Sequence, residues 1–251
     1  MLVMGILNVT PDSFADGGRH NDLEAAVARG LEMIAEGVDI IDIGGESTRP
    51  GADRVSEEEE IARTIPVITE LAKHGVRISI DTMRASTAEA AIKAGASIIN
   101  DVSGGLADSE MLQTAARLQV PYIAMHWRGQ SKDMNSKAIY GDVVSDVISE
   151  LNERIEAALD AGIQKDKLII DPGLGFAKDA EHNWAIIDSI DRFVALGYPV
   201  LVGGSRKRFL GGETPDEREQ ATIELTKRLG TTGVWAVRVH SVKPHKEVLS
   251  A

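Results

Sequence analysis

The chain has 251 residues, a formal net charge of −12, 43% hydrophobic residues, 4% aromatic residues and no cysteine. Its length fits one domain, its acidic balance argues against a nucleic-acid binder, and the lack of cysteine excludes disulfides and thiolate metal sites. No run of about 18 apolar residues predicts a membrane span, and Met1 leads directly into an apolar run without room for a signal peptide. We therefore expect a single cytoplasmic domain over residues 1–251.

Eight short runs rich in β-branched residues recur along the chain, at 2–7, 38–43, 76–80, 97–99, 122–125, 168–170, 200–202 and 235–239. Between them lie segments with helical patterns, at 23–34, 56–73, 84–94, 108–118, 144–159, 182–195, 217–229 and 244–250. Strands that alternate with helices predict βαβ units and a parallel sheet. The expected fold is therefore of the α/β class, a single (β/α)8 TIM barrel.

Polar side chains lie at or just after the ends of these runs: Asn8, Glu46, Asp81, Asn100, His126, Asp171, Ser205, Lys207, Arg238 and His240. In a (β/α)8 barrel all strand carboxyl ends open onto one face, where active sites are built. Two connections, 8–18 and 44–51, are long and rich in glycine, which predicts two flexible loops over this face after strands 1 and 2. The sequence therefore predicts that residues far apart in the chain converge on one pocket.

Asp81, Asn100 and Asp171 form the most informative group. A carboxylate accepts two N–H bonds and an amide offers one donor and one acceptor, so together they suit the guanidine-like edge of a flat ring such as a pterin. The alternative is that Asp81, with Thr82, caps the helix near Arg84, and that Asp171 only opens a turn. The common placement of the three residues favours the ligand site.

Cationic residues near the last two strand ends suggest an anionic ligand. Ser205 and Lys207 follow two glycines that let the backbone approach a phosphate or carboxylate, although a surface basic cluster gives the same pattern. Arg238 and His240 share one face of the last strand, and the arginine needs either an anion or an internal carboxylate. His126 could contact the same ligand or be a buried core histidine.

The metal chemistry that the sequence allows is narrow. It contains no His-Glu-x-x-His motif and no Cys/His cluster, so no zinc site is predicted. Asn8 and acidic residues of the first loop could hold Mg²⁺ only together with ligand phosphates. No serine–histidine–aspartate arrangement can be argued from spacing, so nothing supports a covalent mechanism.

Two loops and six shorter motifs resemble the signatures of dihydropteroate synthases. The loops are 5–14 and 42–51, and the motifs follow in the family's order at 80–82, 100–105, 125–126, 171–176, 205–207 and 238–240. The match spans about residues 3–240. Each motif is short, but eight in order are specific.

The resemblance implies a role for each matching residue. Pterin would be bound by Asp81, Asn100, Met125, Asp171, Phe176, Lys207 and Arg238, of which Asp81, Asp171 and Lys207 would be catalytic. The pyrophosphate would be bound by Arg49, Arg238 and His240, with Mg²⁺ on Asn8. The p-aminobenzoate site would consist of Phe14, Thr48, Pro50, Ser205 and Lys207.

The implied reaction joins 6-hydroxymethyl-7,8-dihydropterin pyrophosphate to p-aminobenzoate and gives 7,8-dihydropteroate and pyrophosphate. Loss of pyrophosphate before attack by the amine would leave a cation that Asp81 and Asp171 can stabilise, and loop closure would exclude water. The resemblance also implies a homodimer and inhibition by sulfonamides, which mimic p-aminobenzoate. The acidic charge and the lack of a long apolar run predict no nucleic-acid or membrane partner.

Two positions depart from the family's usual pattern, and two alternative functions remain. Gly204 stands where a small residue with a β-carbon is more common, and Ser241 stands where an aspartate usually follows. A pterin-binding methyltransferase would share Asp81, Asn100 and Asp171 but would not need 47–50 or 205–207. A catalytically silent pterin-binding paralogue would bind the pterin without turnover.

Overall fold

The computed structural model describes residues 1–10, 18–46, 54–130 and 134–250. Within these residues the strands are β1 Leu2–Asn8, β2 Ile40–Gly44, β3 Arg77–Asp81, β4 Ile98–Asp101, β5 Tyr122–Met125, β6 Leu168–Asp171, β7 Leu201–Val202 and β8 Ala236–Val239. The α-helices are α1 Gly18–Ala35, α2 Glu57–Ala72, α3 Ala85–Ala94, α4 Met111–Leu118, α5 Val143–Asp160, α6 Ala180–Asp188, α7 Ile190–Val194, α8 Glu219–Leu229 and α9 Lys243–Ser250. Short 3₁₀ turns are η2 Met134–Lys137, η3 Lys165–Lys167 and η4 Arg208–Leu210.

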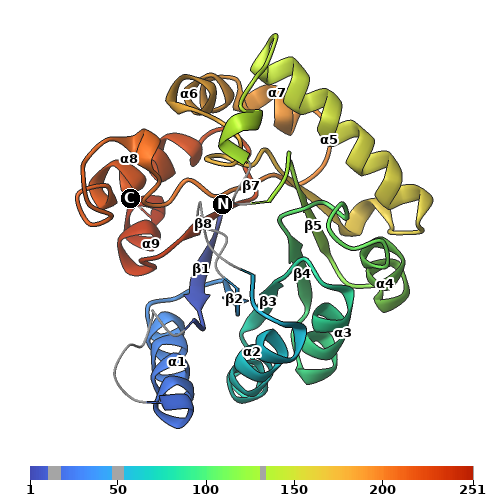
Figure 1. The fold of residues 1–251 in the computed structure, drawn as a ribbon. Coiled ribbons are helices and arrows are strands. Elements are labelled where there is room, and N and C mark those ends of the chain that lie inside the picture. The colour runs from blue at the N-terminus through green and yellow to red at the C-terminus, as the bar shows by residue number, and fades with distance from the viewer. Residues whose placement is uncertain (11–17, 47–53, 131–133, 251) are drawn as a thin grey trace.

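The strands form one parallel sheet that curves into a barrel. Its order is β6-β5-β4-β3-β2-β1-β8-β7, and a parallel bridge between Ile170 of β6 and Val200, just before β7, joins the two edges. In Figure 1 the helices surround the strands on the outside. The predicted (β/α)8 fold is confirmed, with a barrel that is nearly closed.

Most predicted helices begin and end within three residues of their expected bounds, and one predicted helix is divided into two. Ser56 caps α2 as expected, because its side chain accepts a hydrogen bond from the backbone N–H of Glu59 at 3.2 Å. The segment 182–195 is not one helix but two, α6 and α7. Ser189 separates them, since its backbone (φ −113°, ψ 24°) leaves the helical region.

Two apolar layers hold the barrel together. The larger lies between the strands and the surrounding helices, and the smaller fills the barrel interior with Met4, Ile40, Ile98, Ile123, Ile169, Leu201 and Ala236. Side chains alternate along a strand. The residues two positions further along therefore also point inward, nearer the carboxyl ends, and they define the mouth of the barrel.

Within the part of the chain that the structure describes, every helix is too short or too polar to traverse a lipid bilayer.

Candidate active site

The mouth of the barrel is lined by the inward positions at the strand ends: Asn8, Asp42, Gly44, Asp81, Asn100, Met125, Asp171, Gly203 and Arg238. The parallel register places Asn8 beside Gly44, Gly44 beside Asp81, and Asp81 beside Asn100. The two glycines add no side chain to the mouth. A flat ligand would therefore meet carboxylates and an amide without steric obstruction on these strands.

Arg238 lies between two buried carboxylates. Its Nε donates to Asp42 Oδ2 at 2.6 Å and its Nη2 donates to Asp81 Oδ2 at 2.6 Å. Asn100 Nδ2 donates to the same Asp42 oxygen at 3.1 Å. Of the two interpretations that the sequence left open for Arg238, the described contacts show the internal ion pair. These four residues form one hydrogen-bonded group on the mouth floor.

Burial dominates the electrostatics of this group. Burial raises the pKa of Asp81 to about 7, while Arg238 acts in the opposite direction and Asp42 adds to the rise. Burial opposes the charge of Arg238, but the neighbouring Asp42 and Asp81 carboxylates raise its pKa. The guanidinium therefore stays charged, and the protonation of Asp81 can respond to a bound ligand.

Asp42 is a site residue that the sequence analysis did not select. It is fully buried, and among the described residues its Oδ1 has no hydrogen-bond partner. A buried acceptor without a partner costs free energy unless a ligand or water supplies an N–H or O–H. The signal that could have found it is its position two residues after the inward Ile40.

Asp171 and Lys207 lie on the opposite side of the mouth. Asp171 Oδ1 accepts a 2.7 Å hydrogen bond from the backbone N–H of Gly173, and burial raises its pKa against the effect of this bond. Burial lowers the pKa of Lys207 to about 8, with Asp171 opposing. Lys207 Nζ donates to the Leu174 carbonyl and lies 4.5 Å from the centre of the Phe176 ring.

An apolar wall completes the mouth. Met125, predicted for the pterin site, forms a buried cluster with Met83 and Val102, and Phe176 packs against this cluster. Met83 and Val102 were not selected from the sequence, because single apolar residues beyond a strand end carry no distinctive pattern. The wall offers a surface against which an aromatic ring can stack.

Ser205, predicted for the p-aminobenzoate site, and His240, predicted for the pyrophosphate site, are neighbours. Ser205 Oγ lies 2.9 Å from His240 Nδ1 and accepts from the His240 backbone N–H at 3.2 Å. A β-carbon on Gly204 would come within 2.7 Å of Leu225, so the side chain of α8 explains the glycine. Ser241 Oγ accepts from Arg206 Nη2 at 2.9 Å, so it provides an oxygen acceptor where the family usually has aspartate.

His126 does not contribute to the mouth, and the core interpretation holds. It is 1% exposed, and its ring nitrogens contact Glu150 Oε2 at 3.0 Å and Lys178 Nζ at 2.8 Å. The alternation that turns Met125 inward turns His126 toward the helices. Thr82 accepts at 3.1 Å from the N–H of Arg84, the residue just before α3, and so stabilises the turn into the helix without capping it, whereas Asp81 points into the barrel.

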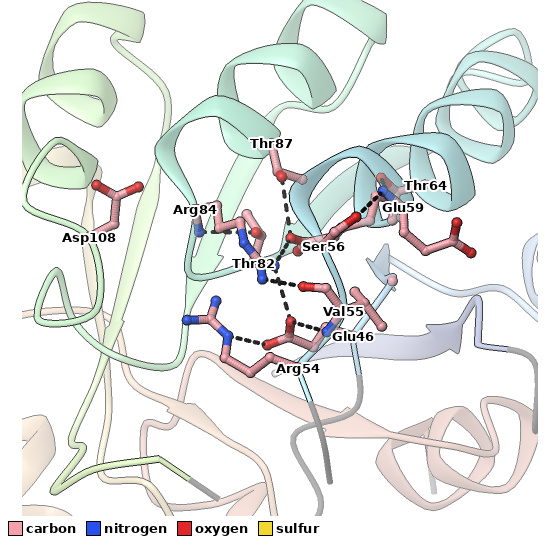
Figure 2. Close-up of polar contacts among 12 residues, drawn as sticks. Glu46, Arg54, Val55, Ser56, Glu59, Thr64, Thr82, Arg84, Thr87 and Asp108 are labelled. Atoms are coloured by element: carbon pink, nitrogen blue, oxygen red, sulfur yellow. Dashed lines mark hydrogen bonds and ion pairs between the residues drawn. The ribbon is translucent and has the colours of Figure 1, made fainter.

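Beside the mouth, Arg84 ties together two parts of the β2–α2 connection (Figure 2). Its Nη1 donates to Glu46 Oε2 at 3.1 Å and to Glu60, and its Nη2 donates to the Val55 carbonyl at 2.5 Å. Glu46 also accepts from Arg54 Nε at 3.0 Å and from the Val55 N–H at 3.1 Å. The residues that flank positions 47–53 are therefore held together by one guanidinium.

Replacing Arg84 by methionine is expected to lower the free energy of unfolding by about 3–5 kcal/mol, because Glu46 and Glu60 would be left buried without their shared cation. Glu46 and Glu60 side chains are only 7% and 1% exposed. Urea unfolding measures the change. Arg117→Met is the matched control, since it breaks an exposed pair between α4 and Glu89 of α3 and should cost at most about 1 kcal/mol. An equal loss in both variants would contradict the prediction.

Four predicted residues, Phe14, Thr48, Arg49 and Pro50, lie outside the described residues. The structure therefore brings together Asp81, Asn100, Met125, Asp171, Phe176, Ser205, Lys207, Arg238 and His240 around the mouth, with Asn8 at the end of β1. It leaves the placement of the other four as a prediction.

A family model described as pterin binding enzyme matches residues 4–240. This match and the polar mouth of the barrel define the class of the protein as a pterin-binding barrel enzyme. The dihydropteroate synthase of Mycobacterium leprae is 47% identical over 98% of this chain and 90% of its own length. That of Bacillus subtilis is 49% identical over 96% of this chain and 84% of its own length. The chain belongs to the dihydropteroate synthase family and is a transferase.

Solved structures agree with this assignment. The Xanthomonas albilineans enzyme with 4-aminobenzoic acid has a TM-score of 0.93 at 44% identity, covering 99% of this chain and 90% of that one. The same enzyme with 7,8-dihydropteroate has a TM-score of 0.90 at 41% identity, covering 99% and 91%. The Yersinia pestis enzyme in a sulfonamide complex has a TM-score of 0.93 at 40% identity, covering 99% and 92%.

Proposed function

We propose that this protein joins 6-hydroxymethyl-7,8-dihydropterin pyrophosphate to p-aminobenzoate and releases pyrophosphate and 7,8-dihydropteroate. The observation that carries the proposal is the set of buried polar groups on the mouth floor, where Asp42, Asp81, Asn100 and Asp171 offer acceptors and an amide beside the Met125 wall. A pterin has a donor-rich edge and a flat apolar face, and this mouth matches both.

The charges at the mouth suit a reaction that begins with departure of pyrophosphate. Positive charge would develop on the pterin's methylene carbon, and the carboxylates of Asp81 and Asp171 would stabilise it from fixed positions. Lys207 would bind the ring and the incoming p-aminobenzoate from the other side, next to Phe176. No strong general base is needed, because the amine attacks a cation.

The pyrophosphate group of the substrate would be bound by Arg49, Arg238 and His240. Arg238 uses Nε and Nη2 for carboxylates, so Nη1 is the atom through which it would donate to a phosphate oxygen. Ser205, which contacts His240, would lie between this region and the p-aminobenzoate site with Phe14, Thr48 and Pro50. Sulfonamides, as mimics of p-aminobenzoate, would compete there.

Mg²⁺ is the proposed cofactor, with Asn8 as its protein ligand. Among the described residues no three His, Asp or Glu side chains are grouped so as to hold a metal ion. The amide oxygen of Asn8 at the mouth is the kind of hard ligand that Mg²⁺ takes, and the ion commonly relies on substrate phosphates and water for the rest. When bound, Mg²⁺ would neutralise charge on the leaving pyrophosphate.

A homodimer and a cytoplasmic location stay proposals. Sedimentation of the purified protein measures the oligomeric state, and cell fractionation measures the location.

The function is tested by pyrophosphate release from the purified protein with Mg²⁺ and both substrates. We expect release that depends on p-aminobenzoate and that a sulfonamide inhibits competitively. Pterin binding without release would favour the silent paralogue. Transfer of a methyl group from a folate to a corrinoid protein would favour the methyltransferase.

A further inference from the structure

Lys178 is a buried lysine that the reaction does not use. Its side chain is 8% exposed, and its ammonium contacts His126 Nδ1 at 2.8 Å, the Phe176 carbonyl at 3.0 Å and the Gly173 carbonyl at 3.1 Å. An ammonium has three N–H donors, and here all three find acceptors within the protein. Lys178 therefore acts as a fixed connection between β5 and the turn after β6.

The turn that Lys178 binds carries two sides of the pterin site. It begins at Asp171, whose Oδ1 accepts from the Gly173 N–H at 2.7 Å, and it presents Phe176 beside Lys207. Lys178 binds the carbonyl of Gly173 and that of Phe176. The ammonium thus binds the carbonyl of Gly173, the residue whose N–H donates to the Asp171 carboxylate. It also binds the backbone carbonyl of Phe176.

The backbone of this turn needs external contacts to keep its shape. Gly173, Gly175 and Ala177 have φ values of +69°, +75° and +49°. Such a conformation is disfavoured for alanine and persists only when its surroundings impose it. Tyr140 contributes one such contact, because its hydroxyl donates to the Ala177 carbonyl at 2.9 Å, and Lys178 contributes the others.

His126, which contacts Lys178 on the side away from the turn, is itself held in place by further contacts. Burial, with Lys178 adding, lowers the pKa of His126 to about 4, so the imidazole is neutral and its Nδ1 can accept. Its Nε2 faces Glu150 Oε2 at 3.0 Å, and the same oxygen accepts from Arg128 Nε at 3.0 Å. The chain of contacts therefore ends on α5, outside the barrel.

We propose that Lys178 is a positioning residue for the pterin ring: it holds the 173–177 turn so that Phe176 and Asp171 keep the geometry that binds the pterin. This inference rests on the proposed function. Lys178 is assigned to neither substrate, and the turn that it binds carries the pterin-site residues Asp171 and Phe176, whereas Ser205 and Lys207 of the proposed p-aminobenzoate site lie outside this turn. Loss of the Lys178 side chain should therefore weaken binding of the pterin substrate and leave binding of p-aminobenzoate nearly unchanged.

The test compares Lys178→Met with Lys165→Met, an exposed lysine before β6 that lies over the Tyr198 ring. Binding of 6-hydroxymethyl-7,8-dihydropterin pyrophosphate is measured by calorimetry without p-aminobenzoate, and both KM values are measured by pyrophosphate release. We expect the pterin Kd and KM to rise about tenfold to a hundredfold in Lys178→Met, as for a misplacement near 1 Å. The KM for p-aminobenzoate should stay within about twofold, and Lys165→Met should match the unchanged protein.

Equal rises in both KM values, or no rise in the pterin Kd, would overturn the positioning role. If Lys178→Met does not fold, His126→Gln is tested in its place. This substitution removes the Nδ1 acceptor of Lys178, while the glutamine amide can still reach Glu150. The pterin Kd should then rise about threefold to tenfold. Failure of the unchanged protein to release pyrophosphate would instead refute the proposed function, and the calorimetric comparison would still decide the role of Lys178.

Discussion

Replacing Arg238 by methionine is expected to lower the free energy of unfolding by about 3–5 kcal/mol and to abolish pterin binding. The guanidinium is the cation between Asp42, which is fully buried, and Asp81, which is 7% exposed. Without it, two carboxylates would face each other in the barrel with no compensating charge, and one must take up a proton or the fold must open. Urea unfolding at neutral pH and calorimetry with the pterin substrate measure both effects.

Arg228→Met is the control for Arg238→Met, since its pair with Asp188 is exposed and should contribute at most about 1 kcal/mol. Adding Asp42→Asn to Arg238→Met should recover part of the lost stability, because one of the two buried charges is then gone. A double variant as unstable as Arg238→Met alone would contradict the ion-pair explanation.

Asp171→Asn is expected to reduce kcat/KM for pyrophosphate release by about 10²–10³-fold, the usual cost of removing one fixed group that stabilises transition-state charge. The fold should survive, because the asparagine amide oxygen can still accept from the Gly173 N–H. The effect should therefore appear in pyrophosphate release and not in the unfolding midpoint.

Asp166→Asn, on the 3₁₀ turn before the same strand, is the matched control and should keep full activity. Activity of Asp171→Asn within about threefold of the unchanged protein would remove Asp171 from the proposed mechanism. A large fall in its stability would assign it a structural role instead.

The overall architecture could be predicted because it follows from patterns in short segments of the sequence. Eight apolar runs of strand length alternate with helical segments, and this alternation leaves few topologies for a parallel sheet. Ser56 was recognisable as a cap for the same reason, since capping depends on residues within one turn. Ser189 was not recognisable as a break, because the pattern from 182 to 195 is helical on both sides of it.

The site was only partly predictable. Residues just beyond the apolar runs of the sequence, such as Asp81, Asn100 and Asp171, were found because a barrel brings all strand ends to one face. Asp42 was missed, although it pairs with Arg238 and Asn100, because it lies inside a strand. The role of Lys178 also depends on packing, because its ammonium is enclosed by two carbonyls and an imidazole.

The sequence by itself determined the class of fold, the family and most of the residues at the mouth, since these follow from order and spacing along the chain. Only the tertiary structure decided which side of each strand faces inward. In a parallel barrel both faces of a strand are buried, so a strand such as 40–44, which is apolar except for Asp42, lacks the regular polar alternation that marks an exposed face. That is why Asp42 and His126 could not be assigned to the mouth or to the helix layer until the packing around Ile40 and Met125 was known.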